Sequence, residues 1–370
     1  MALRKQINNL FSFVDDPRVA GRVTHKLVDI LFIGLCTFLS NGEDYEDMVE
    51  FAEQRYDWLC TIIDLKGGIP SHDTFNRVFQ IIDPEQFSNC LGEDARLLIG
   101  TFRDQLIRLD GKKVRGENPT SRGNAGLYLL NAWIAEHQLC IAQQEVGEKS
   151  NEITAIPVLL DRLELEGATV SIDAIGCQVD VAEQIVKQDA DYVLSVKKNQ
   201  KLLFEEVVES FDLQAKHEQH SQWEYDHGRY ETRVCSMVCA QGMLNPDLEA
   251  KWPSIKTFVR IDASRTENGI TSTQSRYYIS SHDNKSVEWF NQTVRGHWSI
   301  ENNLHWHLDV SFNEDASRAR RGHAAKNLST MRKLALNRVK QMSTKLSIRK
   351  RRFRASLNLD YLLEMLLQDF

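Results

Sequence analysis

The sequence lacks a hydrophobic run long enough to span a bilayer. Its longest apolar stretch, Leu27 to Leu39, includes Asp29 and falls well short of the roughly 20 apolar residues that a membrane helix needs. The N-terminal segment, Met1 to Leu10, also lacks the apolar core of a signal peptide. We therefore expect a cytoplasmic protein that makes no membrane contact.

Paired cysteines are missing as well. Seven cysteines are scattered along the 370 residues, and none shows the spacing of a zinc knuckle. Cys235 and Cys239 are four positions apart, but no second pair matches them. An odd number of scattered thiols is typical of a reducing compartment and disfavours a disulfide-stapled scaffold. A chain of this length can bury a core without such staples.

Acidic residues are absent from one stretch of the chain. The segment from Ala316 to Arg354 holds nine arginines, five lysines and no Asp or Glu, although the whole chain carries a net charge of −7. Apolar residues recur at helical spacing from Leu328 to Val339, which predicts an amphipathic basic helix over Ala324 to Met342. Two interpretations stay open. The helix contacts nucleic acid, or it packs on the body with its charges facing water or the acidic N-terminal region.

The length predicts two or three domains, and the first 95 residues have a helical pattern. The stretch from His25 to Ser40 is apolar on most sides, as in a buried helix. Ser71 or Asp73 is placed to cap a helix that reaches Ile82. Two short helices around the glycine-proline turn are compatible with a helix-turn-helix, although most such pairs do not bind DNA.

Strand-like alternation begins near residue 103. A first strand breaks at Gly111, and two more follow with a short turn at His137 and Gln138. A helix, a strand, a helix and a strand come next, which is the order of a ribonuclease H-like core. We predict an α/β fold with a ribonuclease H-like mixed sheet, a β-rich insertion at about residues 200–285, an N-terminal all-helical domain and basic C-terminal helices. The predicted domains are residues 1–95, residues 103–342 with the insertion, and a basic tail or helix at residues 343–370.

Two aspartates follow apolar strands. Asp110 comes after Leu106 to Leu109 and before a turn glycine, and Asp173 ends the run from Val170 to Ile172. Aspartate is disfavoured in strands, and the carboxyl ends of strands are where α/β folds build their sites. Taken singly, each aspartate is more often a turn former or a helix cap.

Glu301 is expected on a helix. There it shares a face with Val294 and Leu308 that is apolar and aromatic apart from Glu301 and its flanking histidines. A carboxylate on such a face must be paired, protonated or bound to metal. A salt bridge to Arg295 or Arg318 is the structural alternative.

Together, the two aspartates and Glu301 predict a site built of carboxylates alone. Hard oxygen ligands without cysteine favour Mg²⁺ or Mn²⁺ over Zn²⁺. Two such ions about 3.5–4 Å apart can activate a water or hydroxyl and stabilise the leaving oxygen of a phosphodiester. The basic segment would supply phosphate contacts. A zinc site at His297, Glu301 and His305 is the alternative, although it lacks the His-Glu-x-x-His order of metalloproteases.

Six segments carry a resemblance to a known family. They are LDGKKVRG (109–116), EKSNEITAIPVLLDRL (148–163), VSIDAIGCQ (170–178), YVLSVKKNQ (192–200), HGRYETR (227–233) and HWSIENNLHWHLDVSFNED (297–315). With these segments the sequence resembles the H-repeat-associated transposases, which are DDE transposases of bacterial insertion sequences. The resemblance covers nearly the whole chain, including the helical N-terminal domain that accompanies this class.

The resemblance implies that Asp110, Asp173 and Glu301 form a DDE triad that holds two Mg²⁺ ions, for which Mn²⁺ can substitute. Such an enzyme cuts DNA at terminal inverted repeats and joins the 3′ hydroxyls to target DNA. Because two ends must be brought together, we expect a homodimer on DNA, associated with the nucleoid. The residues expected to contact DNA are Lys112, Lys113, Arg115, Lys197, Lys198, Asn199, Arg229, Arg233, His297, His305, Arg318, Arg320 and Arg321.

One departure from the family concerns the helix around Glu301. Many relatives carry Tyr, Arg, Glu and Lys at fixed spacing there, whereas this sequence has Val294, His297, Glu301 and Leu308. Contacts that relatives make through that Arg and Lys therefore do not carry over, and His297 or His305 is a candidate substitute. Three functions compete: a transposase, a two-metal nuclease that cleaves without joining, and a non-catalytic DNA-binding descendant.

Overall fold

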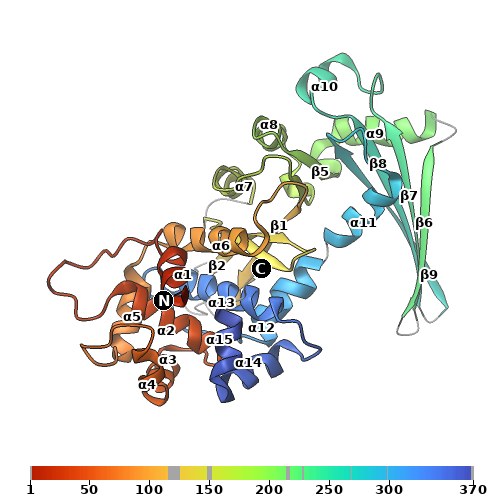
Figure 1. Cartoon of the computed structure of the whole chain (residues 1–370). Coiled ribbons are helices and arrows are strands. Elements are labelled where there is room, and N and C mark those ends of the chain that lie inside the picture. Colours follow the sequence, from red (N-terminus) through yellow and green to blue (C-terminus); the bar gives the residue numbers. More distant parts are fainter. Residues whose placement is uncertain are drawn as a thin grey trace. The chain divides into compact units, whose positions relative to one another are not determined.

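Nine strands form one mixed sheet in the order β3-β2-β1-β4-β5-β9-β8-β7-β6 (Figure 1). The computed structural model describes residues 2–115, 126–147, 152–213, 217–226, 229–267, 269–297 and 299–367. The chain divides into unit 1, residues 1–101, 111–149 and 301–370, and unit 2, residues 102–110 and 150–300. Strand β1 (Leu106–Val114) contributes residues to both units. The domain boundaries expected from the sequence remain a prediction.

Parallel strands form the centre of unit 2. Within it, β1 pairs with β4 (Thr169–Ile172), and β4 pairs with β5 (Asp191–Val196), both in parallel. Val170 and Tyr192 on these strands are fully buried, as in parallel strands that are covered on both faces. The helices of this unit are α7 (Glu152–Asp161), α8 (Val179–Lys187), α9 (Lys201–Leu213), α10 (Pro246–Lys251) and α11 (Val287–His297).

A long antiparallel meander extends the sheet of unit 2. Its strands are β6 (Glu218–Asp226), β7 (Arg229–Cys239), β8 (Thr257–Glu267) and β9 (Ile270–Ser280). β9 pairs antiparallel with β5, so the insertion expected near residues 200–285 continues the same sheet. Strand β6 was not expected from the sequence because EQHSQWEYD is almost wholly polar. It is an edge strand of the sheet, so only one of its sides pairs with another strand.

Unit 1 contains the antiparallel pair β2 (Leu127–Ile134) and β3 (Leu139–Glu145) and most of the helices. Its helices are α1 (Ala2–Leu10), α2 (Leu27–Leu39), α3 (Tyr45–Gln54), α4 (Tyr56–Cys60), α5 (His72–Ile81), α6 (Pro84–Ile99), α12 (Trp306–Val310), α13 (Ala324–Gln341), α14 (Ile348–Leu357) and α15 (Leu359–Leu367). Several helices begin at a capping side chain. Ser71 accepts a hydrogen bond from the Thr74 N–H, which confirms the expected cap of α5.

Helices α2 and α13 form the core of unit 1. Nearly all of α2 is buried, as its apolar sequence predicts. Gly34 allows the close approach of its neighbours, since a Cβ there would lie 3.3 Å from Met331 Cε of α13 and 3.4 Å from Met48 Cε of α3. α13 also packs against α5, α6, β3, α14 and α15. A helix with so many neighbours has little surface left for solvent.

Helix α13 packs on the body, as the second sequence interpretation expected, and one of its cations faces an acidic residue of the N-terminal region. The burial of its other charges was not expected. Lys333 is fully buried and Arg332 is 2% exposed, so these cations do not face water. Arg338 forms an ion pair with the buried Asp94 of α6, and its Nε donates to Asp94 Oδ1 at 2.7 Å. The amphipathic pattern concealed this arrangement because internal partners compensate the buried cations.

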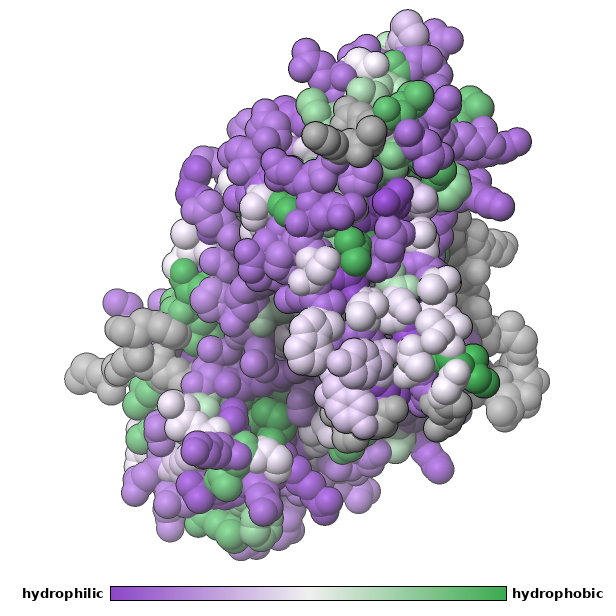
Figure 2. Space-filling model, turned by 90° about the vertical axis from the view of Figure 1, so that its right-hand side faces the viewer, coloured by the Kyte–Doolittle hydropathy of each residue, from purple (hydrophilic) through white to green (hydrophobic). Residues whose placement is uncertain are grey.

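The surface is largely polar. On the face drawn in Figure 2, hydrophobic side chains occur in small separate groups among hydrophilic ones. Among the helices that the structure describes, we find none with the length and apolarity needed to traverse a membrane.

Candidate active site

Asp110 and Asp173 follow paired positions on neighbouring parallel strands. Leu109 of β1 is in register with Ile172 of β4, and the next residue of each chain segment is one of the two aspartates. Asp173 caps the 3-10 turn that follows β4, because its Oδ1 accepts a hydrogen bond from the Ile175 N–H at 3.0 Å. Both carboxylates are half-buried. The register thus brings two hard oxygen donors to adjacent strands of unit 2.

The two aspartates differ in their position relative to the end of the strand. β4 ends at Ile172, so Asp173 lies at a strand end as predicted. β1 runs on through Gly111 to Val114, so the expected break at Gly111 is wrong and Asp110 lies inside a strand. The residues after Asp110 keep extended geometry because Lys112 and Val114 are both buried there. Sequence alone signals glycine as a turn and cannot show this burial.

His297 lies beside Asp173 in unit 2. Its Nδ1 is 3.1 Å from Ser171 Oγ, two residues before Asp173. Burial lowers the pKa of His297 to about 4, although the nearby Asp173 acts in the opposite direction and Arg108 acts with burial. Gly296 makes room for this packing, since a Cβ there would collide with the Arg108 guanidinium. His297 is consequently a neutral, half-buried group near the candidate site.

Glu301 begins a π-helical turn, Glu301–His305, that leads into α12. Leu304 and Leu308 are fully buried, whereas Glu301 is exposed. The prediction that Glu301 lies on the apolar face is therefore wrong. Because a π-turn bonds residue i to i+5, the seven-residue spacing from Glu301 to Leu308 no longer returns to the same face. Arg295, one expected salt-bridge partner, is instead paired with Glu224.

The three acidic residues are divided between the two units. Asp110 and Asp173 belong to unit 2, whereas Glu301 belongs to unit 1. Among the described residues, no group of three or more His, Cys, Asp and Glu side chains is arranged to hold a metal ion. This finding gives no support to the zinc alternative at His297, Glu301 and His305. The donor chemistry of the aspartate pair, all carboxylate oxygen, fits Mg²⁺ or Mn²⁺.

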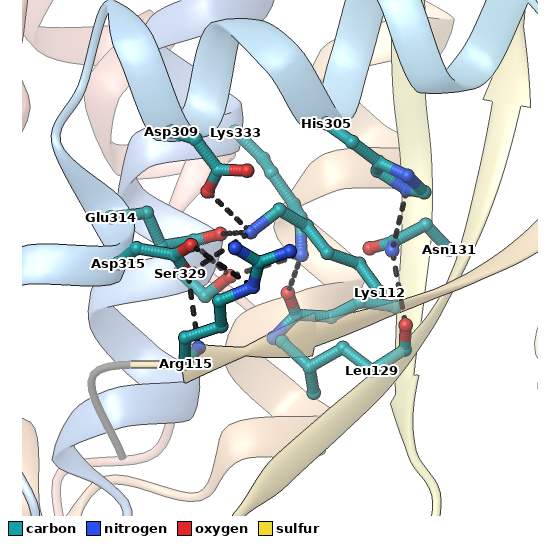
Figure 3. A network of polar contacts seen from close by, with 11 residues as sticks. Lys112, Arg115, Leu129, Asn131, His305, Asp309, Glu314, Asp315, Ser329 and Lys333 are labelled. Carbon is teal, nitrogen blue, oxygen red and sulfur yellow. Dashed lines mark hydrogen bonds and ion pairs between the residues drawn. The ribbon is translucent and has the colours of Figure 1, made fainter. Parts of the chain in front are cut away.

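A buried network of charges surrounds Lys112 in unit 1 (Figure 3). The Lys112 side chain is 6% exposed, and its ammonium lies 2.6 Å from Asp309 Oδ1, 3.0 Å from Glu314 Oε2 and 3.7 Å from Asp315 Oδ1. Glu314 in turn accepts a hydrogen bond from Ser329 Oγ at 2.7 Å. Lys112 was expected to contact DNA, but its ammonium group is instead paired with these carboxylates.

The network sets unusual pKa values. Burial alone would raise the pKa of Glu314, but Lys112, Lys333 and Arg332 outweigh it and lower that pKa to about 2. Burial alone would lower the pKa of Lys112, but Glu314 and Asp309 outweigh it and raise that pKa above its usual value. For Lys333 burial prevails, and its pKa is lowered. Lys112 and Glu314 are therefore held as an ion pair at neutral pH.

His305 lies at the other end of the π-turn. Its Nε2 is 3.5 Å from Asn131 Nδ2 on β2, and Asn131 Nδ2 donates to Leu129 O at 3.1 Å. Burial, with the cations Lys112 and Lys333 acting in the same direction, lowers the pKa of His305 to about 3. This histidine is accordingly neutral and half-buried, which makes it a poor phosphate contact.

The other residues expected to contact DNA lie in several places. Lys113 and Arg115 are exposed near the end of β1, and Arg115 lies 3.8 Å from Asp315 through its Nε. Arg229 and Arg233 are half-buried on β7. The exposed candidates after β5 and before α13 are Lys197, Lys198, Asn199, Arg318, Arg320 and Arg321. Asn199 also donates to Ala174 O at 2.7 Å, which joins the loop after β5 to the turn after Asp173.

Comparison with known proteins gives the family. The model for the transposase DDE domain matches residues 101–338, and the model for the region associated with that domain matches residues 9–93. The chain belongs to the DDE transposase family. This transposase has a mixed sheet and many helices, as the sequence predicted.

Relatives of this transposase match along most of their length. It is 36% identical to "H repeat-associated putative transposase YhhI" of Escherichia coli (strain K12), over 99% of this chain and 98% of the relative. It is 44% identical to "Uncharacterized protein in dhlA 3'region" of Xanthobacter autotrophicus, over 74% of this chain and 93% of the relative. The resemblance to H-repeat-associated transposases is thus confirmed.

One solved structure shows a weak likeness. A piggyBac transposase synaptic complex with hairpin DNA aligns with 98% of this chain and 78% of its own, at 12% identity and a TM-score of 0.38. A likeness at this level carries no argument about the site.

Proposed function

We propose that this transposase cuts DNA at the ends of an insertion sequence and joins the 3′ hydroxyls to target DNA. Asp110, Asp173 and Glu301 are the proposed catalytic triad. Family membership supports the reaction class, and the register of β1 and β4 supports the pairing of the first two residues. Glu301, exposed at the start of a π-turn, is available to a ligand. π-turns often occur at functional sites.

The proposed core is ribonuclease H-like. The elements β1, β2, β3, α7, β4, α8 and β5 follow one another in the expected order. β1, β4 and β5 pair in parallel, and β2 pairs antiparallel with β3. The strands β6 to β9 then form the insertion before the segment that carries Glu301. This arrangement supports the proposed core more directly than composition does.

Two Mg²⁺ ions are the proposed cofactors, with Mn²⁺ as a substitute. Asp110, Asp173 and Glu301 would hold them, and the ions would activate the attacking oxygen and stabilise the leaving one. The chain itself would orient these carboxylates: Asp173 through its bond to the Ile175 N–H, and Asp110 through its place in a paired strand. His297, neutral and beside Asp173, would add no positive charge next to this ligand.

DNA is the proposed partner, held by a homodimer in the nucleoid. Lys113, Arg115, Lys197, Lys198, Asn199, Arg229, Arg233, Arg318, Arg320 and Arg321 are the proposed contacts. Most of them are exposed cations, which bind phosphates and release counterions. His297 and His305 are withdrawn from this set, because burial keeps both neutral.

A strand-transfer assay tests the proposal. Purified protein is incubated with the terminal repeats of its element, a target plasmid and Mg²⁺, and joined products are sequenced. We expect joining by the wild-type protein and none by Asp173→Ala, with DNA binding retained. Joining that persists in Asp173→Ala would refute the assigned role. Cleavage without joining would favour a nuclease, and salt-sensitive binding without any cleavage would favour a non-catalytic descendant.

A further inference from the structure

Lys112 connects two segments of unit 1 that carry or adjoin proposed catalytic residues. It lies on β1, two positions after Asp110 in the sequence. Its ammonium contacts Asp309 on α12, and Glu314 and Asp315 in the 3-10 turn that follows. As Figure 3 shows, these three carboxylates converge on the one ammonium group. The contacts thus fasten the end of β1 to the segment that begins with Glu301.

A second set of contacts secures the same segment. Leu304 and Leu308 anchor the π-turn and α12 in the core of unit 1, since both are fully buried. His305, between them, approaches Asn131 of β2. Glu301 alone among these residues faces solvent. The exposed carboxylate of Glu301 therefore begins a segment whose apolar side chains pack in the core and whose C-terminal end is held by Lys112.

Stability alone explains this network poorly. Removing an ammonium and its carboxylate partners from water carries a desolvation penalty of several kcal/mol per ion, and a well-packed apolar side chain in a strand avoids it. The network also spreads through Glu314 to Ser329, whose hydroxyl accepts a hydrogen bond from Lys333 Nζ at 3.0 Å. What a buried ion pair provides is directional geometry, which apolar packing supplies less well.

We propose that Lys112 is a positioning residue for the transposase reaction: its bonds to Asp309 and Glu314 fix the segment that carries Glu301 relative to the end of strand β1. Lys112 acts through these carboxylates and touches neither DNA nor the reacting atoms. The inference rests on the proposed function, because positioning matters only if Glu301 takes part in catalysis. Sub-ångström placement of catalytic groups affects the rate of the chemical step more than it affects the affinity for substrate.

Three variants test the role of Lys112. Lys112→Met removes the ammonium with little change in volume. Lys112→Met combined with Asp309→Asn also removes the carboxylate closest to the ammonium, which the first change would leave without a cation, and so protects folding. Arg338→Met is the matched control, because it deletes another buried cation of unit 1 whose partner is Asp94. Thermal unfolding confirms that each protein is folded before it is assayed.

The measurements separate positioning from stability. We expect Lys112→Met and the double variant to lower kcat for end cleavage by about 100-fold, with KM for DNA within about twofold of wild type. Arg338→Met is expected to lower the melting temperature without this loss of kcat. A folded Lys112→Met protein, or a folded double variant, with wild-type kcat would overturn the proposal.

Hydrogen exchange gives a readout that needs no activity. We expect the amides of residues 301–310 to exchange about tenfold faster in Lys112→Met, and to be unchanged in Arg338→Met. Equal exchange in wild type and Lys112→Met would refute the connection even in an active enzyme. If the wild-type protein fails to cleave DNA but this exchange difference appears, the proposed function fails and the connection stands.

Discussion

Ser171 Oγ of β4 lies 3.1 Å from Nδ1 of His297 on α11. This contact joins the strand that ends just before Asp173 to the last residue of α11. Because burial lowers the pKa of His297 to about 4, the ring is neutral at pH 7 and has one nitrogen that can accept and one that can donate. Asp173 therefore has a fixed, uncharged neighbour.

We expect Ser171→Ala to lower the free energy of unfolding by about 1 kcal/mol, since it leaves a buried ring nitrogen without its partner. Urea denaturation measures this change. Ser195→Ala, the same deletion on the adjacent strand β5, is the control, because none of the described residues hydrogen-bonds to that hydroxyl. Equal losses in the two variants would show that the contact with His297 contributes nothing.

The carboxylates of the proposed triad should be needed for DNA cleavage and dispensable for DNA binding. Asp110→Asn and Glu301→Gln are each expected to slow end cleavage by about 100- to 1,000-fold, because weaker metal coordination forfeits several kcal/mol of transition-state stabilisation. Gel-shift affinity for terminal-repeat DNA should change little. Asp180→Asn, an exposed change on α8, serves as control. Chelation of divalent metal should abolish cleavage, and added Mg²⁺ or Mn²⁺ should restore it.

Arg352 of α14 holds separate parts of unit 1 together. Its guanidinium donates to Phe38 O at 2.8 Å, to Gly42 O at 3.0 Å and to Ser311 O, and lies 4.0 Å from the centre of the Phe312 ring. Arg352→Met should lower the free energy of unfolding by about 3–5 kcal/mol, because three carbonyls lose a donor. Arg352→Lys should not rescue it, since an ammonium lacks the planar fork.

Thermal and urea unfolding of the Arg352 variants test this expectation. Arg349→Met is the matched control, since Arg349 is exposed on the same helix. We expect the control to change the free energy of unfolding by less than about 0.5 kcal/mol. A Lys at position 352 that restored wild-type stability would show that charge matters there and geometry does not.

Much of the fold was predictable because local signals determined it. Burial on both faces gives β4 and β5 sequences rich in apolar residues, and the cap at Ser71 marks the start of α5. α13 begins where the pattern predicted and packs on the body, as one interpretation expected, but the burial of its cations was not expected. The sequence shows that Lys333 and Arg338 are charged, and only the three-dimensional partners, such as Asp94, show that they are buried.

The candidate site was predictable in part for a similar reason. A carboxylate after an apolar strand is a local signal, and it identified Asp173 as lying at a strand end. The π-turn at Glu301 has no such signal in the sequence. The face of Glu301 was assigned with the period of an ordinary α-helix, which the π-turn does not follow. The carboxylate partners of Lys112 were missed, since they lie about 200 positions away in the sequence. The run of Asp309, Glu314 and Asp315 next to a basic segment was the available hint.

Acidification should weaken unit 1 through His305. The pKa of this histidine is about 3 in the folded chain because of burial, against an ordinary value near 6.5 when unfolded. As the pH falls below about 6.5, the unfolded chain binds a proton that the folded chain refuses, so the free energy of unfolding decreases. Between pH 7 and 5 we expect a loss of about 1–2 kcal/mol from this residue, allowing for its partial exposure.

His305→Gln should reduce this pH dependence. Urea denaturation at pH 7, 6 and 5 measures the slope, and this range avoids Glu314, whose pKa of about 2 places its titration lower. His217→Gln serves as a comparison in unit 2. An unchanged slope in His305→Gln would mean that the ring is protonated or exposed in the folded protein.

The arginines before α13 should carry part of the affinity for DNA. Arg318 and Arg321 are exposed and follow the buried Glu314, so their guanidinium groups can reach phosphates. Replacing either with alanine should weaken binding similarly on all DNA sequences and reduce the slope of log K against log salt by about 0.9, the value for one lost phosphate contact on duplex DNA. Titrations at several salt concentrations measure that slope. Lys66→Ala, an exposed change far from this segment in the sequence, should leave the slope unaltered. An unchanged slope in the arginine variants would place the phosphate contacts elsewhere.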